Sequence, residues 1–484
     1  MKKIFLFISF IALTVSSCSD DITSLNDDTK NPTTTRAEFL FTNAQKNLVD
    51  QMVSTSVNVN VFRLFSQYWT ETTYPDESQY DIATRAIPDT HFRVLYRDVL
   101  RDLQEAKKLL EAEKAGIPAT ATTELAVVNN KIAIVDILMS YSYSVLVDTF
   151  GDVPYTESLD IEGHPLPKYD DAKTIYKDLI SRLTADNNLL TAGDDSFGDA
   201  DLIYGGNAAS WKKFANSLRL RLAINMADVD AAYAATEVIA AVNAGVLASN
   251  ADNTDLTYLG AQPNANPLYA DLVVSGRNDF VPANTFVDKM NALSDPRRAK
   301  YFTEFNGGYS GGIYGTNNNF NNYSHISETL ADPTFAGTIM DYAEVRFLLA
   351  EAAARGIAIT GTAEEHYNAA ITASMENWGV DAADVATYLA SSNVSWATAT
   401  GNWKQKIGEQ AWIALYNRGF EGWSSYRRLD YPVLAAPAEA DITQVPTRYT
   451  YPSREETLNG TNVEAAGTAI GGNTLTTKIF WDVN

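Results

Sequence analysis

The sequence predicts a mainly α-helical protein in which pairs of helices form a scaffold and long loops are inserted between them. After Arg36, apolar residues recur at the spacing of amphipathic helices over most of the chain. The stretches 250–286 and 301–333 lack that period and are rich in Asn, Gly, Tyr, Asp and Pro, as functional or irregular loops are. With 484 residues, 45% of them hydrophobic, the chain can bury a sizeable core.

The N-terminal segment has the composition of a secretory signal. Lys2 and Lys3 precede the apolar run 4–15, and small residues follow it. The run is shorter than the roughly 20 apolar residues that a membrane-spanning helix requires. We therefore expect residues 1–17 to be a signal peptide.

The only cysteine of the chain lies directly after that segment. Residues 15–18 read Val-Ser-Ser-Cys and resemble a bacterial lipobox, in which the cysteine is acylated after cleavage. The alternative is an ordinary signal peptide that happens to contain a cysteine. We predict a lipid anchor at Cys18, a flexible polar tether over 18–35 and a single globular domain over 36–484.

Charge and composition exclude several classes of function. The chain has 37 Lys and Arg against 60 Asp and Glu, and the formal net charge of −23 disfavours binding to nucleic acid. A single Cys excludes a disulfide framework and a Cys-based zinc site. Because the chain has only 4 His, we expect no His-rich metal centre, and we predict neither a metal nor another cofactor.

Four helices are predicted in the first half of the chain. Residues 93–114 place leucines and a valine among charged residues, before a glycine and a proline that end the helix. Residues 129–150 are apolar throughout and predict a buried helix. Residues 171–190 and 210–226 are amphipathic, and Ser210 is the predicted N-cap of the last helix.

A pair of helices is predicted over residues 341–379. Asp341 with Glu344, and Thr362 with Glu365, have the spacing of capping boxes at two helix starts. Two helices joined by a short loop pack as an antiparallel pair. Their Tyr, Ala and Trp residues at helical spacing resemble tetratricopeptide units, without a strict repeat. We interpret these aromatic residues as core packing.

Short segments along nearly the whole chain resemble the SusD/RagB family of outer-membrane nutrient-binding lipoproteins, and its shorter SusD-like branch most. The resemblance implies one mainly α domain, with a tetratricopeptide-like helix-pair scaffold and long loop-rich insertions that form the ligand-binding face. It also implies a binding protein and not an enzyme. The segments are 148–155, 211–223, 295–297, 342–344, 348–352, 405–406, 419–423, 427–428 and 451–456.

The resemblance also implies a partner and a location. The partner is a SusC-like TonB-dependent outer-membrane barrel, to which the lipoprotein delivers a captured oligosaccharide. Residues 19–21, with an acidic pair after Cys18, resemble an export signal for lipoproteins of this family. We therefore expect a lipid-anchored, cell-surface-exposed protein of the outer membrane, with a peptide as the alternative ligand.

Two aromatic segments are candidates for a sugar-binding surface. Sugar rings have apolar faces bordered by hydroxyls, so they bind exposed aromatic rings beside polar side chains. Segment 65–81 and loop 301–323 have this composition, and in the family two such regions form the sugar platform. The alternative is that the first segment completes the core and the loop packs on the barrel. The predicted ligand-binding residues are Trp69, Tyr74, Tyr80, Tyr309, Tyr314 and Tyr323.

Two pairs of arginines are predicted to form buried structural ion pairs, with anion sites as the alternative. The pairs are Arg219 with Arg221 and Arg427 with Arg428. Asp252 and Asp255 could supply oxygen ligands for calcium, although their spacing is not that of a twelve-residue calcium loop. His325 follows the Asn-rich loop and is a further candidate for ligand contact.

The competing classes are a surface glycoside hydrolase or peptidase and a structural or adhesive lipoprotein. The sequence contains no HExxH helix and no Walker loop. It also lacks the alternating strands and helices of a barrel hydrolase. The many carboxylates could still supply a paired acid and base, since their separation is spatial. We predict that the protein is not an enzyme.

Overall fold

The structure is a computed structural model that describes residues 35–193 and 195–483. The chain divides into residues 1–36 and residues 37–484, and all helices and strands named below belong to the second unit. Cys18, the signal peptide expected over 1–17 and nearly all of the expected tether lie outside the described residues.

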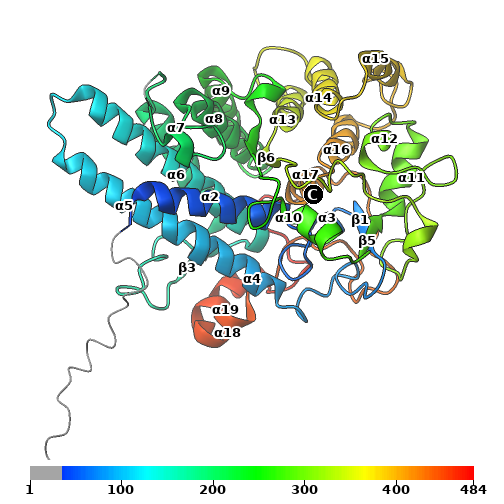
Figure 1. Ribbon diagram of the computed structural model, residues 1–484, viewed down its shortest axis with the longest axis horizontal. Helices are drawn as coiled ribbons and strands as arrows, with labels where there is room; N and C mark the ends of the chain where they lie inside the picture. The colour runs from blue at the N-terminus through cyan, green and yellow to red at the C-terminus, as the bar shows by residue number, and fades with distance from the viewer. Residues whose placement is uncertain (1–34, 194, 484) are drawn as a thin grey trace, which may run out of the picture. The chain divides into compact units, whose positions relative to one another are not determined.

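The first helical block confirms the predicted helical character. α4, η2 and α5 follow one another without a break, so the helix expected over 93–114 is part of a longer one. α2 packs beside α5, and α5 beside α6, as Figure 1 shows. The helices of this block are α2 Ala37–Val53, α3 Phe62–Phe65, α4 Ile87–Arg93, η2 Val94–Leu100, α5 Arg101–Gly116 and α6 Thr122–Phe150.

α6 is the buried helix expected over 129–150, with an earlier start at Thr122. Among the described residues it is the one helix long and apolar enough to cross a membrane, but its whole apolar window is buried within the protein. Its neighbours are α2, α5 and η2, together with α7 Ala172–Leu189 and α8 Ala208–Asn225. α6 is therefore a core helix.

The second block consists of α7 Ala172–Leu189, α8 Ala208–Asn225 and α9 Ala231–Ala244. The Asp171 carboxylate caps α7 by accepting from the amide of Thr174. Ser210 is not the N-cap of α8, because that helix begins two residues earlier. Asn207 is the N-cap, and its side chain accepts from the amide of Ser210 at 3.0 Å.

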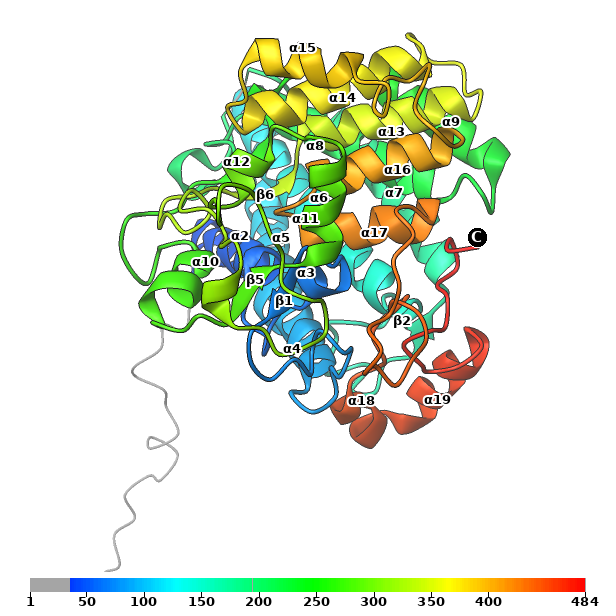
Figure 2. The ribbon, with the colours of Figure 1, turned by 90° about the vertical axis from the view of Figure 1, so that its right-hand side faces the viewer.

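The third block confirms the predicted helix pair. Figure 2 shows α14, α13, α16 and α17 as successive layers, and each packs on the next. Thr362 and Glu365 form the predicted reciprocal capping box. Asp341 also caps its helix, but the Glu344 side chain turns to Arg221 instead. The helices are α13 Tyr342–Ala354, α14 Ala363–Asn377, α15 Ala382–Ala390, α16 Trp403–Ala414 and α17 Gly419–Leu429.

The segments between and after these helical blocks contain short helices and three two-stranded antiparallel sheets. The sheets are β1 Trp69–Glu71 with β5 Phe280–Pro282, β2 Val153–Pro154 with β3 Tyr169–Asp170, and β4 Thr254–Leu256 with β6 Gly337–Met340. The short helices are η3 Gly198–Ala200, η4 Asn250–Asp252, α10 Pro267–Tyr269, η5 Ala270–Val274, α11 Asn284–Ala292, α12 Arg298–Tyr301, η6 Phe320–Asn322, α18 Ser453–Leu458 and α19 Gly460–Ala469.

A cluster of aromatic rings joins α3, near the start of the globular unit, to α17 and the segment that follows it. The ring of Phe62 in α3 stacks on Trp423 of α17 at 5.3 Å and on Tyr449 at 5.1 Å. All three side chains are buried. α3 is consequently held against α17, as Figure 2 shows, and β1 follows α3 and packs on it.

Candidate ligand-binding site

Trp69 is a core residue. Its side chain has no exposed surface, and its indole N–H donates to the Tyr416 hydroxyl at 2.8 Å. The guanidinium of Arg63 lies over its ring at 5.2 Å. The expectation that Trp69 exposes a ring face is therefore wrong. β1 pairs with β5, and all three residues of β1 are buried.

Tyr80 and Tyr314 are also buried, with 2% and 6% of their surface exposed. The Tyr314 hydroxyl donates to the carbonyl of Leu64 at 2.7 Å, and its ring lies 6.3 Å from that of Tyr80. The expectation of exposed rings is wrong at these two positions as well. Both residues instead join the loop after α12 to the segment around β1, so the two predicted aromatic regions do meet.

Tyr74, Tyr309 and Tyr323 retain accessible surface. Tyr74 is 68% exposed, while Tyr309 and Tyr323 are half-buried. The Arg298 guanidinium lies over the ring of Tyr309 at 5.4 Å, so that aromatic face is already occupied. Of the six predicted residues, Tyr74 alone is both mostly exposed and part of a hollow in the surface.

Tyr74 lines a groove with a volume of about 210 Å³ between the end of β1, the loop after α2 and η5. The backbone of Tyr74 is in the left-handed region, with φ of +55°. That conformation costs a bulky residue roughly 1–2 kcal/mol, and strained residues of this kind cluster at ligand sites. The polar side chains of the groove are Thr55, Ser56, Asn58, Glu71, Thr73, Arg85, Asp271, Ser275, Arg277 and Asp279.

The charges in this groove are mutually compensated. Arg277 donates from Nε to Asp279 at 2.7 Å, and Arg85 pairs with Glu77 behind the groove. Burial raises the pKa of Asp271, although its carboxylate accepts backbone hydrogen bonds from the loop after α2. The groove therefore offers fixed donors and acceptors next to an aromatic ring, and no unpaired cation among its described residues.

Sequence reasoning missed the polar residues of the groove. Arg277 and Asp279 lie in the stretch 250–286, whose composition predicts only a long loop. The signal that could have found them is this oppositely charged pair in a loop. Its relation to Tyr74 depends on the pairing of β1 with β5, because the Thr72 amide donates to the Asp279 carbonyl at 2.9 Å.

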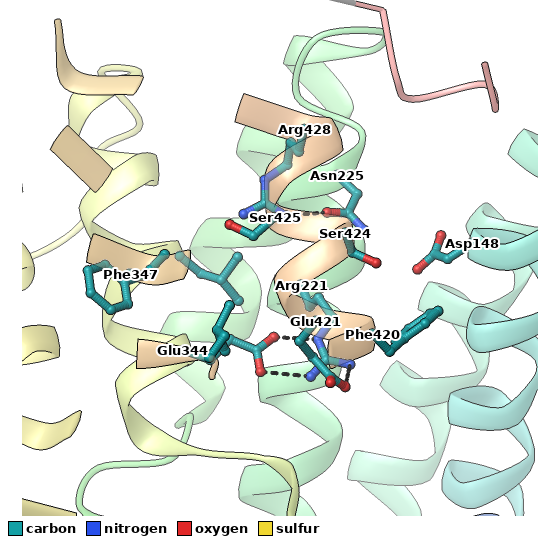
Figure 3. A pocket seen from close by; sticks show the side chains of 13 residues that line it. Asp148, Arg221, Asn225, Glu344, Phe347, Phe420, Glu421, Ser424, Ser425 and Arg428 are labelled. Carbon is teal, nitrogen blue, oxygen red and sulfur yellow. Dashed lines mark hydrogen bonds and ion pairs between the residues drawn. The ribbon is translucent and has the colours of Figure 1, made fainter. Parts of the chain in front are cut away.

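A second, enclosed cavity lies among buried charges between α8, α13 and α17 (Figure 3). Arg221 forms two hydrogen bonds to Glu344, at 2.6 and 2.9 Å, and Arg418 donates to the same carboxylate at 2.6 Å. Burial raises the pKa of the adjacent Glu421 to about 7. The cavity volume of about 20 Å³ suits one water molecule and no sugar. This network of buried charges therefore has a structural role and is not a ligand-binding site.

The predicted buried ion pairs are confirmed for two of the four arginines. Glu344 is the partner of buried Arg221 and Glu351 that of buried Arg428, whereas Arg219 pairs with Glu237 in a half-buried position. Arg427 differs, because its guanidinium donates to the carbonyls of Asp148 and Thr447 and lies 3.4 Å from the centre of the Trp423 ring.

The remaining candidate residues have structural partners. Asp252 accepts from the Lys213 ammonium at 2.6 Å, and Asp255 accepts from the Thr338 hydroxyl at 2.5 Å. Within residues 35–193 and 195–483, no three His, Cys, Asp or Glu side chains are grouped as a metal site requires. His325 stacks on the ring of Phe320 at 3.8 Å.

The comparisons with known proteins agree with this fold. A family model described as "Starch-binding associating with outer membrane" (SusD-like) matches residues 29–452. A chitin-binding protein of known structure is 27% identical, with a TM-score of 0.80 over 93% of this chain and 100% of its own. A SusD homologue from Bacteroides uniformis is 28% identical, with a TM-score of 0.77 over 92% and 100% of the two chains.

A chitin-binding SusD homologue from Flavobacterium johnsoniae shares the fold at 24% identity, with a TM-score of 0.77 over 92% of this chain and 99% of its own. Comparison with the curated proteins gives no match. The family match covers most of the chain, and the mainly helical fold with paired helices is that of the solved relatives. The chain therefore belongs to the SusD-like family, whose members associate with the outer membrane.

Proposed function

We propose that this protein is a non-catalytic, cell-surface glycan-binding lipoprotein that holds oligosaccharide in the groove beside Tyr74. The observation that carries the proposal is the exposed ring of Tyr74 next to the Arg277–Asp279 pair. The description of the family as starch-binding and the chitin-binding title of a structural relative support a carbohydrate as the ligand.

The chemistry of the groove suits a sugar. The ring of Tyr74 offers an apolar surface to the C–H face of a pyranose. The paired guanidinium and carboxylate of Arg277 and Asp279 can donate to one hydroxyl and accept from its neighbour. Because these charges are already paired, their orientation is held before the ligand arrives, which lowers the entropy lost on binding.

The other five predicted binding residues have different roles in the proposed site. Trp69, Tyr80 and Tyr314 support the groove from the core, whereas Tyr309 and Tyr323 lie on the loop after α12 and could contact a longer chain of sugars. Asn318 connects this loop to the groove, since its side-chain amide donates to the carbonyl of Glu71 at 3.0 Å.

The location and partner follow from family membership and from the N-terminal sequence. We infer a lipid anchor at Cys18 that holds the protein on the outer membrane, and a SusC-like TonB-dependent barrel that receives the captured oligosaccharide. The family's association with the outer membrane supports this inference. Cys18→Ala should abolish labelling by a palmitate analogue, and labelling that persists in this variant would exclude the anchor.

The proposed ligand is tested by isothermal titration of the soluble protein, starting at residue 36, with maltooligosaccharides, chitooligosaccharides and peptides. We expect an oligosaccharide to bind without new reducing ends, and Tyr74→Ala to weaken binding by about 10-fold or more, as losing a stacked ring does. Leu458→Ala is the matched control, because Leu458 is 69% exposed but lies on α18 and not in the groove.

Three results would contradict the proposal. Equal affinity of Tyr74→Ala and Leu458→Ala would place the ligand elsewhere. Binding of peptides and of no glycan would change the ligand class, and sustained release of reducing ends would show an enzyme.

A further inference from the structure

Two buried glutamates meet at the base of the groove. Glu71 is 3% exposed and Glu77 is 1% exposed, and the two carboxyl groups are neighbours in the interior. Glu71 is the last residue of β1 and pairs with Phe280 of β5, so its backbone position is fixed by the sheet. Burial and the neighbouring carboxyl group both disfavour the ionised form of Glu71, and so raise its pKa.

The hydrogen bonds around the two glutamates leave one buried carboxyl oxygen without a donor. Oε2 of Glu71 accepts from the amide and from the hydroxyl of Ser78, both at 2.9 Å. Oε1 of Glu77 accepts from Nε of Arg85. Oε2 of Glu77 is buried and has no donor among the described side chains and amides. A proton on the neighbouring Glu71 carboxyl would supply the donor that this oxygen lacks.

We propose that Glu71 and Glu77 share one proton at the base of the groove and that this pair is a positioning element, which holds Arg85 beside the ligand. This proposal rests on the function proposed above for the groove, and it adds the protonation state of two glutamates at the base of that groove. Loss of the shared proton would leave two adjacent negative charges, drive the carboxylates apart and displace Arg85.

Other charged groups around Glu71 are too few to stabilise a second negative charge. Burial and Glu77 together raise the pKa of Glu71 to about 9, and the Ser78 hydrogen bonds only partly oppose them. Arg85 is already paired with Glu77, and Arg277 with Asp279. The titratable and charged side chains around Glu71 are Glu77, Tyr74 and Arg85 from its own loop, Arg277 and Asp279 before β5, Asp271 from η5 and Tyr314 from the loop after α12.

The first arm of the experiment measures affinity for the best-binding oligosaccharide from about pH 7 to about pH 10. If protonated Glu71 positions the groove, affinity falls by about tenfold per pH unit above the pKa of Glu71. Glu71→Gln keeps a hydrogen-bond donor to Glu77 but cannot ionise, so this fall should disappear. A fall of the same size in Glu71→Gln would overturn the proposal.

Asp186→Asn is the matched control for the pH range. Asp186 is the other carboxyl whose pKa burial raises to about 9, and it lies on α7 against Asp136. This variant should therefore keep the full fall in affinity. If it loses the fall while Glu71→Gln keeps it, the groove pair is not the titrating group.

The second arm uses the ligand-free protein, so that a failure of the glycan proposal can be told apart from a failure of this one. The NMR signal of the Arg85 Nε–H group should move with a midpoint near pH 9 in the wild-type protein and Asp186→Asn, and stay constant in Glu71→Gln. If no glycan binds but this titration occurs, the proposed function fails and the shared proton stands. An Arg85 signal that does not titrate overturns the shared proton, whatever binds.

Discussion

The phenolic hydroxyl of Tyr314 donates a 2.7 Å hydrogen bond to the backbone carbonyl of Leu64, across 250 residues of sequence. Leu64 belongs to α3, which packs against α17, so this bond attaches the loop after α12 to the core. The next residue, Gly315, continues the attachment by donating its amide to the Thr70 hydroxyl at 3.2 Å. The position of the loop after α12, beside β1, therefore depends on the buried side chain of Tyr314.

We predict that Tyr314→Phe lowers the free energy of unfolding by about 0.5–1.5 kcal/mol, because the buried hydrogen bond to the Leu64 carbonyl is lost while the Gln67 amide still donates to that carbonyl. Urea denaturation measures this change. Tyr74→Phe, which removes the hydroxyl of an exposed tyrosine, is the control and should change stability by less than about 0.5 kcal/mol. Equal effects of the two variants would mean that the Tyr314 bond does not hold the loop.

Arg221→Met should destabilise the protein by about 3–5 kcal/mol, because Glu344 would keep a buried charge with only Arg418 as a close cationic partner. Arg277→Met is the matched control, since the Arg277 side chain is 63% exposed and its pair with Asp279 is a surface one. Its expected cost is below about 1 kcal/mol. A mild effect of Arg221→Met in thermal and urea unfolding would show that the network relaxes or admits water.

Gly422→Ala should destabilise the protein by about 1–3 kcal/mol through overpacking. A Cβ atom at this position would lie 2.2 Å from the hydroxyl of Tyr68, which donates to the carbonyl of Trp412. Gly116→Ala is the control, since a Cβ added there would meet no atom within 4 Å and the residue belongs to a helix. It should stabilise by about 0.5–1 kcal/mol. A neutral Gly422→Ala would show that Tyr68 can shift.

Stability should fall as pH rises above neutrality. The folded-state pKa values of Glu71 and Asp186, both raised to about 9 by burial and a neighbouring carboxylate, exceed the values of 4.5 and 3.8 expected in the unfolded chain. Between the unfolded-state and folded-state pKa values, the native state therefore holds protons that the unfolded chain has released. The free energy of unfolding falls as pH rises through this window, which ends at about pH 9.

Each group contributes up to about 1.4 kcal/mol per pH unit in this window. His91 does not mask the effect, because burial lowers its pKa to about 3 and it is neutral in both states above about pH 7. Asp186→Asn should reduce the slope of the unfolding free energy between about pH 7 and about pH 9. An unchanged slope would mean that Asp186 is ionised in the native protein.

Local sequence predicted the helices well, because their signals lie within a few residues. Thr362 and Glu365 form the predicted capping box, and the apolar run 129–150 forms the buried α6. The start of α8 was predicted less well, since Asn207 and Ser210 are both good N-caps and only packing decides between them.

The binding residues were predicted less well, for a physical reason. An aromatic residue in a loop has the same sequence signal whether its ring packs inward or faces water. Trp69 is buried because β1 pairs with β5, whereas Tyr74, five residues later, turns outward through a left-handed backbone. Neither outcome is encoded in the spacing of these residues alone.

The sequence by itself determined the helical class of the protein, its family resemblance and the segments from which a site would be built. The tertiary structure alone decided which side chains share the groove, because Tyr74, Asp271 and Arg277 approach one another only through strand pairing and helix packing. It also brought Glu71 against Glu77, and with them a charge state that depends on burial and that no residue spacing reveals.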